Sequence, residues 1–229
     1  MVIEFYYHPL SPPSQVVWMV LKELNIPHKA NLVDLLSEDN NKEAYTAINK
    51  YKVVPAIIDG DLTLSESRAI AMYLCVKYEP KDKAERLYPC SGVAEIANFN
   101  RLVFRDIDNY QTLLKYLNGD EIFVGTASGP KENLLPKAIA VLEEVEKLLS
   151  GKQYVFGNHL TLLDFFVLTT VSCMEVIDTD WKKYPAIAKW KSDLMKLPYF
   201  EECHAKGVKE FVELYKEYCA KSASNPERK

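Results

Sequence analysis

Short apolar runs, the pattern of β-strands, recur four times in the N-terminal third of the chain. They lie within residues 2–7, 28–35, 54–58 and 62–64. Helical spacing of apolar residues covers residues 15–24 and extends again from about Ser65 to Lys77. The last two runs flank an Asp-Gly-Asp turn and therefore form a hairpin. A polar stretch from Ser37 to Lys50 has weak helical character. The order strand, helix, strand, weak helix, hairpin and helix predicts a four-stranded mixed sheet with helices on its faces.

The rest of the chain is helical in period. Apolar residues repeat in steps of three and four from Ile96 to Leu117 and from Leu135 to Leu149, which predicts two amphipathic helices packed as a pair. The segment LTLLDFFVLTTVSCMEV (160–176) lacks a polar face and predicts a helix buried on all sides. Thr161 stands three residues before an aspartate, the spacing of a capping box. Two further helices, punctuated by prolines, are expected after it.

A charged segment with two prolines, YEPKDKAERLYPCSG (78–92), separates the two patterns and is typical of a linker. The chain therefore has the pattern of two domains, an α/β domain followed by an all-α domain. We expect the α/β domain over residues 1–79, the linker over 80–91, the all-helical domain over 92–220 and a flexible tail over 221–229.

Charge and cysteine usage exclude several classes of function. The 28 basic and 32 acidic residues are spread along the chain and give a net charge of −4, so no basic stripe is available for nucleic acid. The five cysteines are widely spaced and form no metal-binding pattern with histidine. The N-terminus lacks the pattern of a signal peptide, and no apolar stretch is long enough for a membrane span. We expect a cytoplasmic protein with reduced thiols, no metal, and neither nucleic acid nor membrane as a partner.

A proline inside the apolar run VVPAI is the first sign of a binding site. Proline cannot donate to a sheet, so Pro55 is expected either to open a strand or to follow a cis bond. A cis bond would turn the backbone N–H and C=O of Val54 outward, where an extended peptide could pair with them. Nearby, Ser65, Glu66 and Ser67 lie at a predicted helix N-terminus, which favours a carboxylate. The two features predict a docking site for a short anionic peptide.

Three segments together resemble a known family. A thioredoxin-like N-terminal domain with VVPAI and LSESRAIAMYL, followed by a helical domain with LTLLDFF, is similar to the cytosolic glutathione S-transferases. The segment FYYHPLSPPSQVV resembles the insect delta and epsilon classes and, more distantly, the theta class, in which a serine follows the first strand. The resemblance implies a homodimer that uses glutathione as co-substrate and conjugates its thiol to apolar electrophiles in detoxification.

The resemblance also implies roles for particular residues. Ser11 would donate a hydrogen bond to the glutathione sulfur. Enzymes of the delta and epsilon classes commonly hold the glycine end of glutathione with histidines, where this chain has Asn40 and Lys52. The expected glutathione-binding residues are Asn40, Lys52, Val54, Pro55, Glu66, Ser67 and Arg68. The expected electrophile pocket comprises Pro13, Phe104, Ile107, Tyr110 and Tyr116.

Alternatives to these assignments stay open at this point. Ser14 lies in the same loop as Ser11 but is expected to cap or open the following helix, and Tyr6 and Tyr7 are expected to be core residues. A non-catalytic carrier of apolar ligands could share the fold. An omega-like thiol reductase would need a cysteine near position 11, whereas the first cysteine is Cys75.

Overall fold

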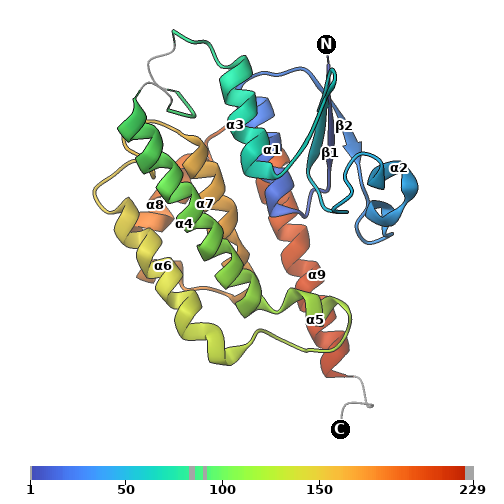
Figure 1. Cartoon of the computed structure of the whole chain (residues 1–229). Helices are drawn as coiled ribbons and strands as arrows, with labels where there is room; N and C mark the ends of the chain where they lie inside the picture. Colours follow the sequence, from blue (N-terminus) through green and yellow to red (C-terminus); the bar gives the residue numbers. More distant parts are fainter. Residues whose placement is uncertain (1, 83–85, 90–91, 225–229) are drawn as a thin grey trace.

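The computed structural model describes residues 2–82, 86–89 and 92–224 and contains a four-stranded sheet beside a group of helices (Figure 1). The strands are β1 (Ile3–Tyr7), β2 (His28–Leu32), β3 (Ala56–Asp59) and β4 (Leu62–Ser65). Their order in the sheet is β2-β1-β3-β4; β1 and β2 are parallel, and the other pairs are antiparallel. The predicted four-stranded mixed sheet is confirmed.

Helices cover both faces of this sheet. Two of them, α1 (Pro12–Glu23) and α3 (Ser67–Tyr78), lie between the sheet and the helices of the C-terminal part (Figure 1). Their apolar residues join the main hydrophobic core, which is continuous with the helical part of the chain. The short helix α2 (Glu43–Thr46) lies on the opposite face, where Tyr45 packs in a smaller cluster.

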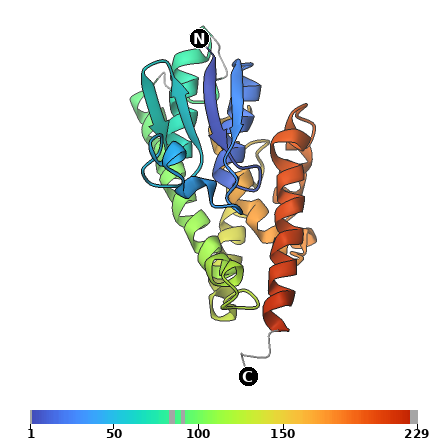
Figure 2. The same ribbon diagram turned by 90° about the vertical axis from the view of Figure 1, so that its right-hand side faces the viewer.

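The C-terminal part contains six α-helices among the residues described. They are α4 (Val93–Leu117), α5 (Gly119–Phe123), α6 (Leu135–Leu149), α7 (Leu162–Ser172), α8 (Pro185–Leu194) and α9 (Lys206–Ala223). Helix α7 is at the centre and every one of its residues is buried, as its sequence predicts. Turning the molecule by 90° shows α4 and α9 extending below the sheet on either side (Figure 2).

The start of α7 has the predicted capping box. The Asp164 carboxylate accepts the backbone N–H of Thr161 at 2.8 Å and that of Val155 at 2.9 Å. It also accepts the Thr161 hydroxyl at 3.1 Å and the Trp190 indole N–H at 2.9 Å. Four donors on one buried carboxylate join the helix start, the preceding loop and α8.

The structure corrects several element boundaries. Helix α1 begins three residues earlier than expected, at Pro12, and β3 begins after Pro55. Helix α5 was not predicted, because its five residues are too few to show a helical period. Helix α9 continues to Ala223, so the first three residues of the expected flexible tail are helical; the burial of Ser222 shows that the helix still packs there.

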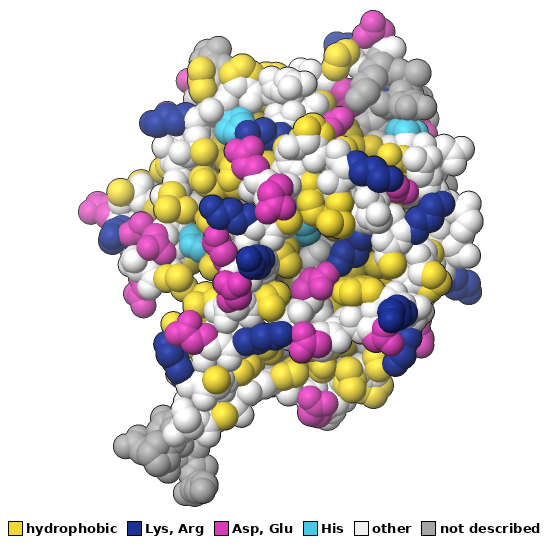
Figure 3. Space-filling model, turned by 180° about the vertical axis from the view of Figure 1, so that it is seen from behind, with side chains coloured by type: hydrophobic (Ala, Val, Ile, Leu, Met, Phe, Trp, Pro, Cys, Tyr) yellow, Lys and Arg dark blue, Asp and Glu magenta, His cyan; other side chains and the backbone are white. Residues whose placement is uncertain are grey.

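Parts of the expected linker and tail lie outside the described residues, namely residues 83–85, 90–91 and 225–229, and so does Cys90. The described cysteines Cys173, Cys203 and Cys219 are free thiols. Within the ranges described, no helix has the length and apolar character needed to cross a membrane. On the face seen from behind, basic side chains stand beside acidic ones and do not gather in a stripe (Figure 3).

Candidate active site

Two adjoining cavities lie where the sheet half meets the helices. The larger has a volume of about 560 Å³ and the smaller about 360 Å³. They share Pro13, Val53, Val54 and Tyr110 as lining residues, so they are two parts of one cleft. The larger cavity contains Ser11 and an apolar wall, and the smaller contains the N-terminus of α3.

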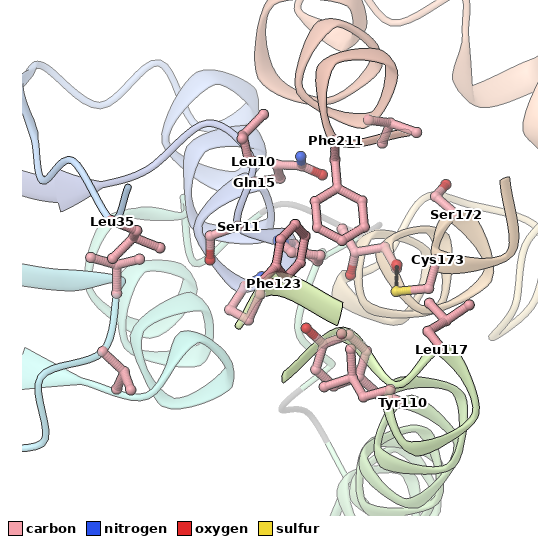
Figure 4. Close-up of a pocket in the computed structure, with 18 of the residues that line it drawn as sticks. Leu10, Ser11, Gln15, Leu35, Tyr110, Leu117, Phe123, Ser172, Cys173 and Phe211 are labelled. Atoms are coloured by element: carbon pink, nitrogen blue, oxygen red, sulfur yellow. Dashed lines mark hydrogen bonds between the residues drawn. The ribbon is translucent and has the colours of Figure 1, made fainter. Parts of the chain in front are cut away.

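Ser11 is the N-cap of α1 and lines the larger cavity. Its Oγ accepts the backbone N–H of Ser14 at 3.4 Å, so the hydroxyl proton stays available to donate to a ligand. The side chain lies at the positive end of a twelve-residue helix, which favours an anion beside it. Figure 4 shows Ser11 at the edge of the open space, facing the aromatic side chains of the opposite wall.

The alternatives to Ser11 are held elsewhere. Ser14 is fully buried, and its Oγ accepts the His8 N–H at 3.4 Å, so the expectation that it caps α1 is wrong. The prolines at positions 12 and 13 could have identified Ser11 as the cap, because proline favours the first helical position and the cap lies just before it. Tyr7 stacks on Phe5, and neither it nor Tyr6 lines the two cavities described here.

The Val54–Pro55 peptide bond is cis, as the sequence analysis expected. Among the described residues, no hydrogen bond uses the backbone N–H or C=O of Val54. The carbonyl of Val53 is held instead, by the Tyr45 hydroxyl at 2.6 Å and the Asn49 amide at 2.7 Å. The segment is therefore fixed, and Val54 lines the cleft while its backbone N–H and C=O remain unused.

Asn40 and Lys52 lie together at one end of the larger cavity. The Asn40 amide donates to the Lys52 carbonyl at 2.9 Å, and Lys52 has a positive φ of 58°. The side-chain ammonium of Lys52 is exposed at the rim, where a carboxylate could pair with it. Asn40 thus supports the Lys52 backbone, and Lys52 supplies the charge at this end.

Glu66 and Ser67 line the smaller cavity at the start of α3. Glu66 has φ 71° and ψ 105°, a conformation that non-glycine residues rarely adopt and that concentrates at ligand sites. Arg68 also lines this cavity; its guanidinium pairs with Asp106 on α4 and lies 5.2 Å from the Phe166 ring on α7. Arg68 therefore links the site to the helical domain.

The structure corrects part of the expected electrophile pocket. Tyr110, Ile107 and Pro13 line the cleft, but Phe104 is 67% exposed to solvent and Tyr116 is 2% exposed in the core. At about 100° per residue, positions six apart on a helix differ by about 120° in direction. Tyr110 faces the cleft, so Phe104 and Tyr116 point away from it on opposite sides.

Most of the apolar wall of the larger cavity was not predicted from the sequence. Besides Tyr110, the wall consists of Leu114, Leu117, Phe123, Cys173, Val208 and Phe211. Phe123 of α5 and Phe211 of α9 have ring centroids 6.0 Å apart, and Figure 4 shows both rings beside the cavity. Burial raises the pKa of Cys173 to about 12, so this thiol stays protonated and belongs to the wall. No group of three metal-ligating side chains occurs in the part of the chain that the structure describes.

Comparisons with known proteins agree on one family. Residues 5–82 match the model of the glutathione S-transferase N-terminal domain, and residues 121–198 match that of the C-terminal domain. The chain is 29% identical over 195 residues to "Glutathione S-transferase D7" of Drosophila melanogaster, covering 85% of each protein.

Solved structures of similar proteins extend this agreement to the whole fold. Drosophila melanogaster glutathione S-transferase isozyme E7 is 30% identical, with a TM-score of 0.87 and coverage of 95% of this chain and 97% of that one. An epsilon-class glutathione S-transferase from the housefly, Musca domestica, is 26% identical, with a TM-score of 0.86 and coverage of 94% and 98%.

Proposed function

Because this chain belongs to the glutathione S-transferase family, we propose that it conjugates the sulfur of glutathione to small apolar electrophiles, with Ser11 stabilising the thiolate. The observation that carries this proposal is the position of Ser11, in one cleft between peptide-docking groups and an apolar wall. Glutathione would bind as an extended peptide along the sheet side. The electrophile would occupy the space lined by Tyr110, Phe123 and Phe211.

The docking groups match the chemistry of the tripeptide from end to end. The unused N–H and C=O of Val54 would pair with the cysteinyl backbone, as an added strand does. Glu66 and Ser67 would hold the γ-glutamyl end of glutathione. The Glu66 carboxylate would pair with the γ-glutamyl ammonium group, and Ser67, at the α3 N-terminus, would bind the γ-glutamyl carboxylate. Lys52 would pair with the glycine carboxylate.

The conjugation step needs no further reactant. With an aryl halide, the sulfur–carbon bond forms as the carbon–halogen bond breaks; halide leaves with the bonding electrons and the thiol proton goes to solvent. The Ser11 hydroxyl donates to the sulfur throughout and keeps its own proton. The apolar wall holds the electrophile close to the sulfur, which supplies effective concentration.

The activity itself can be tested with purified protein, glutathione and a chromogenic aryl halide. We expect saturable conjugation and glutathione binding by calorimetry. A protein that binds apolar dyes but neither binds glutathione nor forms the conjugate would contradict the proposal and favour the carrier function.

Replacing Lys52 with methionine tests the proposed glycine end. Because the ammonium is exposed, we expect KM for glutathione to rise about five- to tenfold with kcat changed less than about twofold. The matched control is Lys50→Met, since Lys50 lies over the Tyr51 ring and lines neither cavity described here. Equal KM values for both variants would remove Lys52 from the glutathione site.

We further propose that the protein acts in the cytoplasm as a homodimer assembled through α3 and α4. The support for the interface is Phe104, a large apolar side chain exposed on α4. A Phe104→Glu substitution should shift sedimentation from a dimer toward a particle of 26.2 kDa. Met195, also exposed but at the end of α8, provides the control variant Met195→Glu. Dimers that persist in Phe104→Glu would argue against this interface.

A further inference from the structure

A buried chain of side-chain hydrogen bonds joins the helical domain to the loop that carries Ser11. The Ser172 hydroxyl at the end of α7 lies 3.0 Å from Nε2 of His204. His204 Nδ1 lies 2.8 Å from the Gln15 amide oxygen, and Gln15 Nε2 lies 2.8 Å from the Pro9 carbonyl. Gln15 is 1%, His204 2% and Ser172 6% exposed. This chain of hydrogen bonds ends at Pro9, two residues before Ser11.

The Pro9 carbonyl fixes the direction of the two hydrogen bonds that Gln15 makes in this chain. A carbonyl can only accept, so the Gln15 amide must present its NH₂ group to Pro9 and its oxygen to His204. His204 must then carry a proton on Nδ1. When His204 is neutral, its Nε2 therefore accepts from the Ser172 hydroxyl.

The surroundings of His204 keep it neutral. Burial, reinforced by the charge of Lys191, lowers its pKa to about 3. On its outer side His204 lines a shallow cavity with four charged residues, namely Glu175, Lys191, Lys209 and Glu213. Lys191 is itself paired with Glu175. Across the neutral pH range the direction of the chain therefore does not change.

A close backbone contact also joins the start of α9 to the loop that carries Ser11. His204 lies in a single π-helical turn, Glu201–Ala205, which leads directly into α9. Gly207, near the start of α9, packs closely on the loop between β1 and α1 (residues 8–11), called here the Ser11 loop. A Cβ at Gly207 would overlap the Pro9 carbonyl oxygen and crowd the Gln15 amide. The loop is thus fixed by a close backbone approach and by a hydrogen bond to the same carbonyl.

We propose that Gln15, His204 and Ser172 are positioning residues that set the orientation of the Ser11 hydroxyl toward the glutathione sulfur. They act at the Pro9 carbonyl, which belongs to the first peptide plane of the Pro9–Ser11 turn. Ser172 also lines the electrophile cavity, so the chain ties the wall of that cavity to the thiol-activating loop. This inference rests on the proposed role of Ser11.

The substitution Gln15→Glu tests the chain with little change of shape. The carboxylate still accepts from His204 but cannot donate to Pro9. We expect the pKa of enzyme-bound glutathione to rise by about 0.5–1 unit and kcat to fall about three- to tenfold, with KM for glutathione within about twofold. The expected readouts are the ultraviolet titration of the bound thiolate and steady-state kinetics with an aryl halide.

A histidine pair covers the case in which Gln15→Glu does not fold. His204→Leu removes both hydrogen bonds, whereas His204→Asn places an amide donor near the position of Nδ1. We expect His204→Leu to reproduce the raised thiol pKa and His204→Asn to restore most of the difference. The stability control is His28→Leu, because His28 Nδ1 lies 2.8 Å from the Ile26 carbonyl, outside the cleft. It should leave the thiol pKa unchanged.

The background of Ser11→Ala separates this inference from the proposed function. If the chain acts through Ser11, Gln15→Glu should have no further effect on the thiol pKa once Ser11 is alanine. An unchanged thiol pKa in Gln15→Glu and His204→Leu, alongside a raised one in Ser11→Ala, would overturn the inference alone. No shift in Ser11→Ala would instead refute the proposed role of Ser11.

Discussion

Replacing Ser11 with alanine should lower kcat/KM about 10- to 100-fold at neutral pH while changing the affinity for glutathione far less. The variant loses a hydrogen bond to the sulfur but keeps the docking groups at Val54, Glu66 and Ser67. We therefore expect the loss in turnover rather than in binding. The measurement is a pH–rate profile of both proteins with a chromogenic aryl halide.

Two effects add up to this loss, and pH separates them. Free glutathione, with a thiol pKa of about 8.5, is only about 3% thiolate at pH 7. Lowering the pKa by about 2 units raises the thiolate population about 25-fold, while the weaker nucleophile reacts about 8-fold more slowly, a net gain of about threefold. The remaining loss comes from poorer positioning of the sulfur beside the electrophile.

The population effect in Ser11→Ala should disappear at high pH, where both proteins hold thiolate. The positioning effect should remain, partly offset by the higher nucleophilicity of the more basic thiolate in the variant. The pH range must lie above the titration of His8, a buried neighbour in the Ser11 loop whose pKa burial lowers from 6.5. If the profiles of the two proteins coincide in shape and height, Ser11 does not assist the thiol.

The largest loss of stability is expected for Asp164→Ala. The substitution removes the common acceptor of four buried donors. These are the backbone N–H and the hydroxyl of Thr161, the backbone N–H of Val155 and the indole N–H of Trp190. We expect the free energy of unfolding to fall by about 3–5 kcal/mol. Urea denaturation followed by circular dichroism measures this loss.

An aspartate on the exposed side of α4 provides the matched control for Asp164. Asp108→Ala should change the free energy of unfolding by less than about 0.5 kcal/mol. If Asp164→Ala yields no folded protein, Asp164→Asn gives a milder measure, because its amide oxygen still accepts some of the donors. Stability equal to that of Asp108→Ala would show that the carboxylate does not organise the start of α7.

The cis Val54–Pro55 bond and the start of α3 could be predicted from local sequence features, because these features act over short distances. Pro55 and Glu66 lie within a dozen residues of each other, and their backbone consequences follow from proline chemistry and from helix ends. The choice between Ser11 and Ser14 was also local. The Pro-Pro pair at 12 and 13 identifies the cap, although the sequence analysis did not use it.

The apolar wall could not be predicted in the same way. Phe211 belongs to α9, about two hundred residues from Ser11, and only tertiary packing brings the two to one cavity. Helical period also identified the apolar residues of α4 but did not show which of them face the core, the cleft or the solvent. Phe104 and Tyr116 were therefore assigned to the wrong face.

The resemblance to insect delta and epsilon enzymes was predicted from the Ser11 segment, and the housefly epsilon-class structure matches the chain nearly end to end. The resemblance implied which residues form the site but not the contacts that these residues make. The engagement of Asn40 with the Lys52 carbonyl, and the Gln15–His204–Ser172 chain, became visible only in three dimensions.

The central claim, that Ser11 lowers the pKa of bound glutathione, is tested most directly by titrating the ultraviolet band of the thiolate in the binary complex. This measurement needs no electrophile and is independent of turnover. In the wild-type complex the thiol should titrate about 2 units below its free value of about 8.5. In Ser11→Ala the midpoint should return upward by about 1–2 units. Identical midpoints in the two complexes, or a wild-type midpoint equal to that of free glutathione, would contradict the account.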